Sequence, residues 1–160
     1  MTVTEPSYRV VLASDVDLLL GLMRELQSDD PWSVPFREDE ARGSVHQLLQ
    51  TPSAGRAFFI YQGEVCAGYL VLSFDFSLEY GGKNAWIDEL FVRPEFRGKG
   101  IGSQAVDFAA RTACELGAKV LHLEVNKGNP AINLYRRCGF EDHGRYLLSK
   151  WLDGSHPKDP

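Results

Sequence analysis

The chain centres on one stretch, Trp86-Ile87-Asp88-Glu89-Leu90-Phe91-Val92-Arg93-Pro94-Glu95-Phe96-Arg97-Gly98-Lys99-Gly100-Ile101-Gly102-Ser103. Apolar and acidic residues alternate in its first part, which is rich in strand formers, and Pro94 closes the predicted strand. Three glycines at alternate positions then open an apolar pattern of helical period. Glycine lets a backbone approach a ligand closely, and a helix N-terminus carries partial positive charge, so this turn is suited to a pyrophosphate. Arg97 and Lys99 add positive charge there.

Two known glycine motifs fit this turn poorly. A P-loop needs Gly, four residues and then Gly-Lys-Ser/Thr, which the stretch lacks. The dinucleotide fingerprint is present as Gly100-x-Gly102-x-x-Ala105, with Glu124 near the position expected for a ribose contact. Such a turn follows its strand almost directly, whereas residues 93–97 separate Val92 from the first glycine here. A dinucleotide site is therefore the less favoured interpretation.

A third pattern, Arg-x-x-Gly-x-Gly, is met by Arg97, Gly100 and Gly102 just after a Val-x-Pro sequence. A second stretch reads Asn129-Pro130-Ala131-Ile132-Asn133-Leu134-Tyr135-Arg136-Arg137-Cys138-Gly139-Phe140, an Asn-led turn followed by a helix that carries Leu-Tyr and ends in Gly-Phe. In this order, the two stretches resemble the acetyl-CoA signature and the second signature of the GNAT superfamily of N-acyltransferases. The resemblance extends over residues 57–140.

Within that superfamily, the doublet Asp88-Glu89 before Leu-Phe-Val, and the pattern Pro130-x-Ile132-Asn133-x-Tyr135, look most like the diamine and polyamine acetyltransferases. An acidic pair at this place also occurs in the amino-sugar branch. The resemblance implies an acetyl-CoA-dependent enzyme that acetylates a primary amine on a small cationic acceptor, such as a polyamine or an amino sugar. Two alternatives stay open: a protein lysine or N-terminal acetyltransferase, and a non-catalytic acetyl-CoA-binding module.

Carried onto this chain, the resemblance implies an acetyl-CoA site between two splayed strands that end at Val92 and Val125. The backbone of Leu90, Phe91 and Val92 is expected beside the acetyl and pantetheine arm. The pyrophosphate is expected on the amides of the glycine turn, those of Gly98, Lys99, Gly100, Ile101, Gly102 and Ser103, with added charge from Arg97. The other side of the cosubstrate is expected to be lined by Asn129, Pro130 and Ala131. Tyr135 would be the general acid.

Direct acetyl transfer to an amine requires a base that deprotonates the amine and an acid that protonates the departing thiolate. An amine with a lysine-like pKa of about 10.4 is over three units above neutral pH, so its deprotonation costs roughly 4–5 kcal/mol. A carboxylate must receive that proton, and Asp88 and Glu89 are the candidates. Adjacent strand residues face opposite sides unless a bulge intervenes, so we expect only one to face the acceptor, and the resemblance favours Asp88.

Tyr135 has to protonate the departing thiolate, and a phenol with a pKa of about 10 keeps its proton at neutral pH until that step. Its other interpretation is a tyrosine whose ring packs in the core and whose hydroxyl bonds a backbone carbonyl.

The rest of the chain predicts an α+β fold in a single domain, residues 1–152, followed by a polar tail, residues 153–160. Apolar periodicity predicts helices over about 14–27, 41–49, 101–116 and 129–139, and strands over 8–12, 57–61, 65–74, 85–92 and 120–125. A final hairpin is predicted over 140–151. A short turn joins the second and third strands, so we expect a mixed, mostly antiparallel sheet with helices on both faces.

Composition excludes several classes of protein. A net charge of −5 without a run of Lys and Arg argues against a nucleic-acid partner and suits a cationic substrate. The three cysteines form no Cys-x-x-Cys pair and the four histidines are scattered, so neither a disulfide framework nor a metal site is encoded. The sequence shows neither a leader pattern nor an apolar run of membrane length, so we expect a cytoplasmic protein with no membrane partner.

Three further parts of the chain are candidates for substrate or partner contacts. The two-proline segment 29–36 is either a specificity loop or a connector. Residues Asp75, Glu79 and Tyr80 line either a cationic acceptor pocket or a solvated loop face. Because similar proteins often form dimers, we expect a homodimer, with a contact edge formed by Leu147, Leu148 and Trp151.

Overall fold

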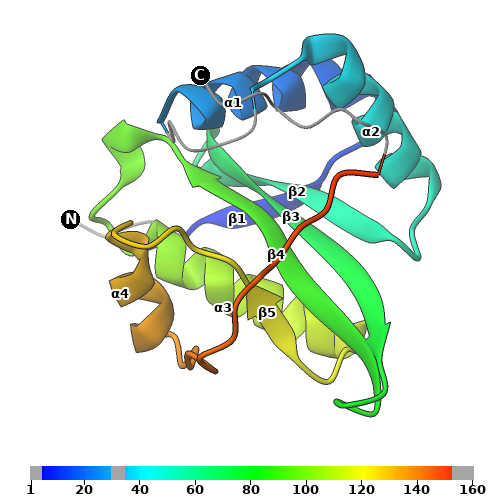
Figure 1. Cartoon of the computed structure of the whole chain (residues 1–160). Helices are drawn as coiled ribbons and strands as arrows, with labels where there is room; N and C mark the ends of the chain where they lie inside the picture. Colours follow the sequence, from blue (N-terminus) through cyan, green and yellow to red (C-terminus); the bar gives the residue numbers. More distant parts are fainter. Residues whose placement is uncertain (1–4, 30–34, 153–160) are drawn as a thin grey trace.

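The computed structural model describes residues 5–29 and 35–152. Its centre is a five-stranded sheet in the order β1-β2-β3-β4-β5 (Figure 1). The strands are β1 Ser7–Val10, β2 Gly55–Gln62, β3 Val65–Ser77, β4 Gly82–Val92 and β5 Leu121–Leu123. The first four pair antiparallel and β5 pairs parallel with β4, which confirms the predicted mixed, mostly antiparallel sheet.

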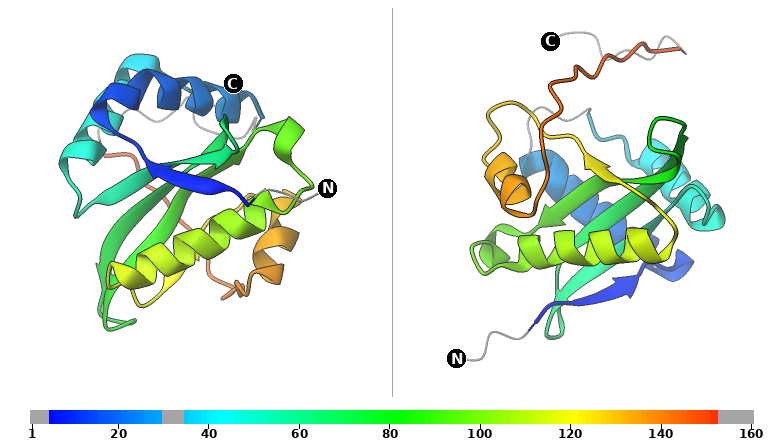
Figure 2. Two further views of the ribbon diagram at one scale, coloured as in Figure 1. Left: turned by 180° about the vertical axis from the view of Figure 1, so that it is seen from behind. Right: turned by 90° about the horizontal axis from the view of Figure 1, so that it is seen from below.

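Helices cover both faces of the sheet, as predicted (Figure 2). One face carries α1 Val16–Asp29 and α2 Glu38–Gln50, and the other carries α3 Ile101–Glu115 with the short α4 Ala131–Arg137 beside it. Two single-turn 3₁₀ helices, η1 Ala13–Asp15 and η2 Pro94–Phe96, precede α1 and α3.

Alternation along the strands divides the apolar side chains between two cores. Phe59, Tyr69 and Phe91 pack with α1 and α2, whereas Leu70 and Leu72 pack with α3. Because successive strand residues point to opposite faces, each strand contributes to both cores. The sheet therefore holds the two helical layers together.

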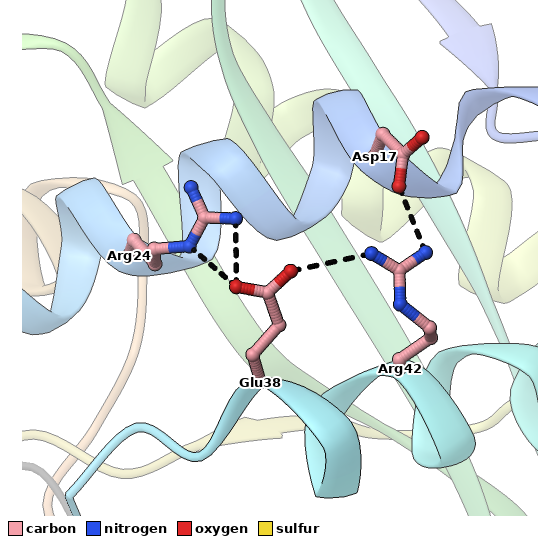
Figure 3. A network of polar contacts seen from close by, with 4 residues as sticks. All are labelled: Asp17, Arg24, Glu38 and Arg42. Carbon is pink, nitrogen blue, oxygen red and sulfur yellow. Dashed lines mark hydrogen bonds and ion pairs between the residues drawn. The ribbon is translucent and has the colours of Figure 1, made fainter.

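Charged side chains connect α1 to α2 (Figure 3). Arg24 of α1 donates to Glu38 Oε2 of α2, at 3.2 Å from Nε and 2.9 Å from Nη2. Arg42 of α2 donates to Glu38 Oε1 at 3.3 Å and to Asp17 Oδ1 of α1 at 2.8 Å. Each of these solvent-accessible pairs is weak in isolation, and together they link the outer edges of two helices whose apolar faces share one core.

The predicted hairpin over residues 140–151 is wrong. A turn does form there, because Gly144 has φ 64° and its N–H donates to Asp142 Oδ1 at 2.8 Å. No strand follows this turn among the described residues, and the segment crosses the β4–β5 half of the sheet as an extended chain (red in Figure 1). Apolar alternation shows which side chains a strand would bury, but a ladder also needs a partner, and the three-residue β5 offers a short edge.

Some predictions fall outside the described residues. These are most of the segment 29–36, of which residues 30–34 are not described, and the tail over 153–160. Among the described residues, no helix is both long and apolar enough to cross a membrane.

The close approach of β3 and β4 at their common end generates a first prediction. Gly68 of β3 pairs with Val92, and a Cβ at position 68 would lie 1.9 Å from the carbonyl oxygen of Phe91. Gly68→Ala should force the strands apart and lower the free energy of unfolding, measured by urea denaturation, by about 1–3 kcal/mol.

The matched control is Gly21→Ala in α1, where an added Cβ meets no atom within 4 Å. This change should leave stability unaltered or increase it by up to about 1 kcal/mol, because alanine favours the helix. Equal stability of the two variants would contradict the close-approach argument.

Candidate active site

Strand β4 carries a bulge at the acidic doublet. Leu72 of β3 pairs with Ile87, while its neighbour Val71 pairs with Glu89, so Asp88 is an extra residue on β4. A bulge interrupts the alternation of side chains, which is the exception allowed for in the sequence prediction. The negative charge of Asp88 reaches Glu89 and helps to raise the pKa of Glu89. The charge of Asp88 therefore adds to the burial that raises the pKa of Glu89.

Glu89 is held by a buried tyrosine of β3. The hydroxyl of Tyr69 donates to Glu89 Oε2 at 2.7 Å, and the tyrosine side chain is fully buried. Burial raises the pKa of Glu89, the bond from Tyr69 lowers it, and the charge of Asp88 raises it again, with a net upward shift. Burial and the two carboxylates hold the pKa of Tyr69 far above its usual value, so its hydroxyl stays a donor. A carboxylate with a raised pKa is a better proton acceptor for an ammonium group.

Asp88 opens into a cavity of about 390 Å³. Although its side chain is exposed, the surrounding protein partly desolvates the carboxylate and raises its pKa. The cavity is lined by Ser73, Phe74, Asp75, Trp86, Ile87, Asp88, Glu124 and Leu147. Three of these residues are acidic and none is basic, so the cavity is suited to a cation.

Strands β4 and β5 separate next to this cavity, as predicted. β4 pairs with β3 as far as Val92, but it pairs with β5 only from Ala85 to Ile87. Past Ile87, the edge of β4 that carries Leu90, Phe91 and Val92 has no strand partner on the β5 side in the described structure. Such an edge offers backbone donors and acceptors to an extended ligand.

The glycine turn has the backbone that an anion site requires. Gly98 and Gly100 have φ values of 73° and 80°, which side chains with a Cβ rarely adopt, and Gly100 is the N-cap of α3. The first helical bond runs from Gln104 N to Gly100 O at 3.1 Å, so the N–H groups of residues 101–103 precede the helical ladder. These amides fit a pyrophosphate.

Closely packed side chains surround the same turn. A Cβ at Gly102 would lie 3.2 Å from Leu134 Cδ2, which shows how near α4 comes to the start of α3. The hydroxyl of Ser103 donates back to Gly100 O at 2.8 Å. Lys99 Nζ donates to Glu95 O at 2.9 Å. The side chains of Lys99 and Ser103 therefore bond the turn's own backbone, which leaves the amides of residues 101–103 as its unpaired donors in the described structure.

Two arginines on either side of η2 fix this region to α1. Arg97 pairs with Asp29 at 2.7 and 3.2 Å, and its Nε donates to Val92 O at 2.7 Å. Arg93 binds both oxygens of Glu25, at 2.7 and 2.8 Å. The guanidinium of Arg97 is thus paired with Asp29 of α1 and with the backbone at the end of β4, and these bonds hold the start of the turn.

The second signature surrounds the start of α4. Asn129 Oδ1 accepts a hydrogen bond from Ala131 N at 2.9 Å, and Pro130 stands between them at the N-cap. This side-chain bond satisfies an amide at the helix N-terminus and fixes the turn.

Tyr135 is half-buried in α4. Its ring packs edge-on against Phe140, with centroids 6.0 Å apart, in a cluster that includes Leu90 of β4 and Leu123 of β5. No described residue forms a hydrogen bond with its hydroxyl, so the alternative of a bond to a backbone carbonyl is not observed. Burial raises the pKa of Tyr135, and Cys138 raises it further, so the phenol holds its proton at neutral pH. A phenol that keeps its proton at neutral pH is chemically suited to donate it.

Sequence reasoning missed Tyr69 and Trp86 as functional candidates. Tyr69 lies in an apolar strand pattern that is equally typical of a core residue, and its bond to Glu89 depends on the register across the hairpin. Trp86 was part of the quoted stretch, but its contact with Asp75, at 3.1 Å from Nε1 to Oδ2, comes from a pairing that sequence periodicity does not specify.

Comparison with known proteins agrees with this geometry. Residues 19–140 match the Acetyltransferase (GNAT) family. The thialysine N-epsilon-acetyltransferase of Bos taurus is 35% identical over 142 residues, which cover 80% of this chain and 79% of that protein. The aminoalkylphosphonate N-acetyltransferase of Salmonella typhimurium is 31% identical over 140 residues, 86% of this chain and 87% of that protein.

Among solved structures, an integron cassette protein from the mobile metagenome of Cole Harbour Salt Marsh is 36% identical. The similarity has a TM-score of 0.79 and covers 91% of this chain and 90% of that one. By class the protein is therefore an acetyltransferase. More particularly, the chain belongs to the GNAT family, whose acyl donor is acetyl-CoA.

The bond from Tyr69 generates a second prediction. Tyr69→Phe removes the one contribution that lowers the pKa of Glu89 and leaves burial and Asp88, which both raise it. The basic form of Glu89 then requires a higher pH. We expect the acidic limb of the pH profile of kcat/KM for acetyl transfer to move to higher pH.

The control for this variant is Tyr61→Phe, which removes another tyrosine hydroxyl, the one that accepts from Arg9 at 3.1 Å. Its profile should coincide with that of the wild type. A Tyr69→Phe enzyme with reduced stability but an unmoved acidic limb would reduce Tyr69 to a packing role.

Proposed function

We propose that this protein is an N-acetyltransferase that transfers acetyl from acetyl-CoA to a primary amine of a small cationic acceptor. The observation that carries the proposal is the pair Asp88 and Glu89, set by a bulge at an acidic cavity where β4 leaves β5. A polyamine, an amino sugar or a similar molecule has the required charge. The two curated relatives are named for different acceptors, so their names do not choose between these molecules.

Each residue is assigned one task. Asp88, at the cavity, contacts the acceptor ammonium, and Glu89, whose pKa is raised, takes the proton so that the amine can attack. Acetyl-CoA supplies the thioester carbon that is attacked. Tyr135 gives its proton to the departing sulfur.

We assign acetyl-CoA binding to the same backbone groups that the sequence analysis predicts. The amides from Gly98 to Ser103 hold the pyrophosphate, and the free edge at residues 90–92 runs along the pantetheine arm. The turn at Asn129, Pro130 and Ala131 lines its other side.

The cavity argues for a small acceptor over a protein. Leu147 of the C-terminal segment contributes to one wall of the cavity, so the space over Asp88 is partly enclosed. A protein lysine or N-terminal amine would need a groove that continues past this wall.

The general acid gives the direct test. Tyr135→Phe removes the proton donor while the ring stays, so kcat should fall about 10²- to 10⁴-fold and acetyl-CoA binding should persist. CoA release is measured over diamines, polyamines, amino sugars and aminoglycosides, and acetyl-CoA binding is measured by calorimetry.

Tyr61→Phe again serves as the control and should retain wild-type turnover. Tight acetyl-CoA binding without turnover on any amine would replace this proposal with a protein acceptor or a binding module. Unchanged kcat in Tyr135→Phe would remove the tyrosine from the mechanism.

We further propose that the protein forms a homodimer through its C-terminal segment. Leu147 and Leu148 are 65% and 88% exposed, and two neighbouring leucines in contact with water favour association. Light scattering should give about twice the chain mass of 17.9 kDa, and Leu148→Asp should give a monomer. Leu78→Asp, at a leucine that is 90% exposed in the β3–β4 turn, is the control. A 17.9 kDa wild-type species at micromolar concentration would exclude the dimer.

A cytoplasmic location belongs to the same proposal. Its support is that Cys66, Cys114 and Cys138 are all free thiols, as is usual in a reducing compartment.

A further inference from the structure

Building on the proposed acetyl-CoA site, we propose that two acidic residues of α1, Glu25 and Asp29, are positioning residues for acetyl-CoA. They act through two arginines of the segment that links β4 to α3. Each acid holds one arginine, and the two pairs fix the free edge of β4 and the glycine turn relative to each other. One face of α1 therefore determines how tightly the protein binds its cosubstrate.

The acids and the arginines match in spacing. Glu25 and Asp29 are four residues apart, so their side chains share one face of α1. Arg93 and Arg97 are also four residues apart and flank η2. Each acid pairs with one of these arginines through two hydrogen bonds, at 2.7 and 2.8 Å for Glu25 and at 2.7 and 3.2 Å for Asp29. Figure 1 shows η2 beside the end of α1. We call the two pairs together the α1 clamp.

The first pair of the clamp fixes the end of β4. Arg93 directly follows the strand, its N–H donates to Ala67 O at 2.8 Å, and its Nη1 donates to Cys66 O at 2.9 Å. The bond from Arg93 lowers the pKa of Glu25, so the carboxylate is charged at neutral pH. A single guanidinium therefore links the end of β4 to the start of β3 and to α1.

The second pair connects the free edge of β4 with the glycine turn. Because Arg93 N bonds the residue before Gly68, the Gly68–Val92 pair exchanges no hydrogen bond of its own, and Val92 O points away from β3. Arg97 Nε donates to this carbonyl at 2.7 Å. The two Nη groups of Arg97 bond Asp29, so Asp29 orients the guanidinium that joins the edge to the turn.

The glycine turn benefits from such support because its own backbone is costly to hold. Gly98 and Gly100 have positive φ values, and glycine loses more backbone freedom on folding than other residues do. Phe96 supplies an apolar anchor, since it packs against the cluster that contains Ile101. A ligand binds in proportion to the fraction of molecules that hold the competent arrangement, so bonds that favour this arrangement raise the affinity.

Charge and position predict opposite effects of removing an acid. Glu25 and Asp29 place negative charge near the turn proposed to bind a pyrophosphate, so by charge alone their neutralisation should tighten CoA binding. The expectation that Arg97 adds charge for the pyrophosphate gives the same sign, because loss of Asp29 would release its guanidinium. Residues that position the turn give the opposite sign, and CoA binding becomes weaker.

The experiment measures CoA binding by calorimetry in wild type, Glu25→Gln and Asp29→Asn, which keep side-chain size and remove charge. Steady-state kinetics give KM for acetyl-CoA and, separately, KM for the best amine of the panel above. Urea denaturation gives the stability of each variant. The matched control is Glu38→Gln, which also removes an acid bonded across α1, at Arg24, and whose side chain is 44% exposed against 38% for Asp29.

We expect each clamp variant to bind CoA about three- to tenfold more weakly, because partly exposed ion pairs shift such an equilibrium modestly. KM for acetyl-CoA should rise by the same factor, whereas KM for the amine should stay at the wild-type value. Glu38→Gln should bind CoA as wild type does, even if its stability falls as much as that of the clamp variants.

The outcomes separate this inference from the proposed function. Unchanged or tighter CoA binding in either clamp variant, or an equal loss of binding in Glu38→Gln, overturns the clamp and leaves the proposed acetyltransferase. Weaker CoA binding in both clamp variants, with wild type inactive on every amine, supports the clamp and overturns the proposed reaction. Absence of CoA binding in wild type overturns both.

Discussion

Strand β4 pairs with β3 along one edge and with β5 along the other, and these two pairings differ at the extra residue, position 88. With β3 it pairs along its whole length and takes up the extra residue as a bulge between the Leu72–Ile87 and Val71–Glu89 pairs. With β5 its pairing ends at Ile87, directly before the bulge. Bulges increase local twist, and a twist at this point carries the end of β4 away from β5. The end of pairing with β5 and the break in side-chain alternation at the acidic doublet therefore coincide at one irregularity.

Features that depend on neighbours in sequence were predictable. The strand, the turn and helix α3 follow from Pro94 and the glycines, and Gly100 does take the left-handed conformation that the turn needs. The mixed, mostly antiparallel sheet and the placement of helices on both faces followed from the short β2–β3 connection and the resemblance. Residue type decides such local geometry almost alone, because it concerns one or two φ angles at a time.

Features that depend on distant partners were not predictable. Alternating apolar residues predict a strand but not its register with a neighbour. The sequence analysis could therefore allow for a bulge at the acidic doublet but could not locate one at Asp88. The predicted hairpin over 140–151 was wrong for the related reason that a strand pattern does not supply a partner. Arg97 was expected to add charge for a phosphate, yet it pairs with Asp29, which is 68 positions away in sequence. A charge in a motif does not reveal which way it faces.

Burial raises the pKa of both proton-transfer candidates. In the proposed reaction the raised pKa makes one group a better base and keeps the other protonated as an acid. Removing water from Glu89 raises its pKa. The difference from the pKa of an ammonium group becomes smaller, and the carboxylate becomes a stronger base. Removing water from Tyr135 also raises its pKa, which keeps the phenol protonated until a thiolate departs beside it. The raised pKa of each group therefore comes from the core on its own side of the sheet. For Glu89 this core is Tyr69 and the α1–α2 layer, and for Tyr135 it is the α3–α4 layer. In the proposed reaction, a thioester lying where β4 and β5 stop pairing would have Glu89, bonded to Tyr69, on one side of the sheet and Tyr135, packed in the α3–α4 cluster, on the other.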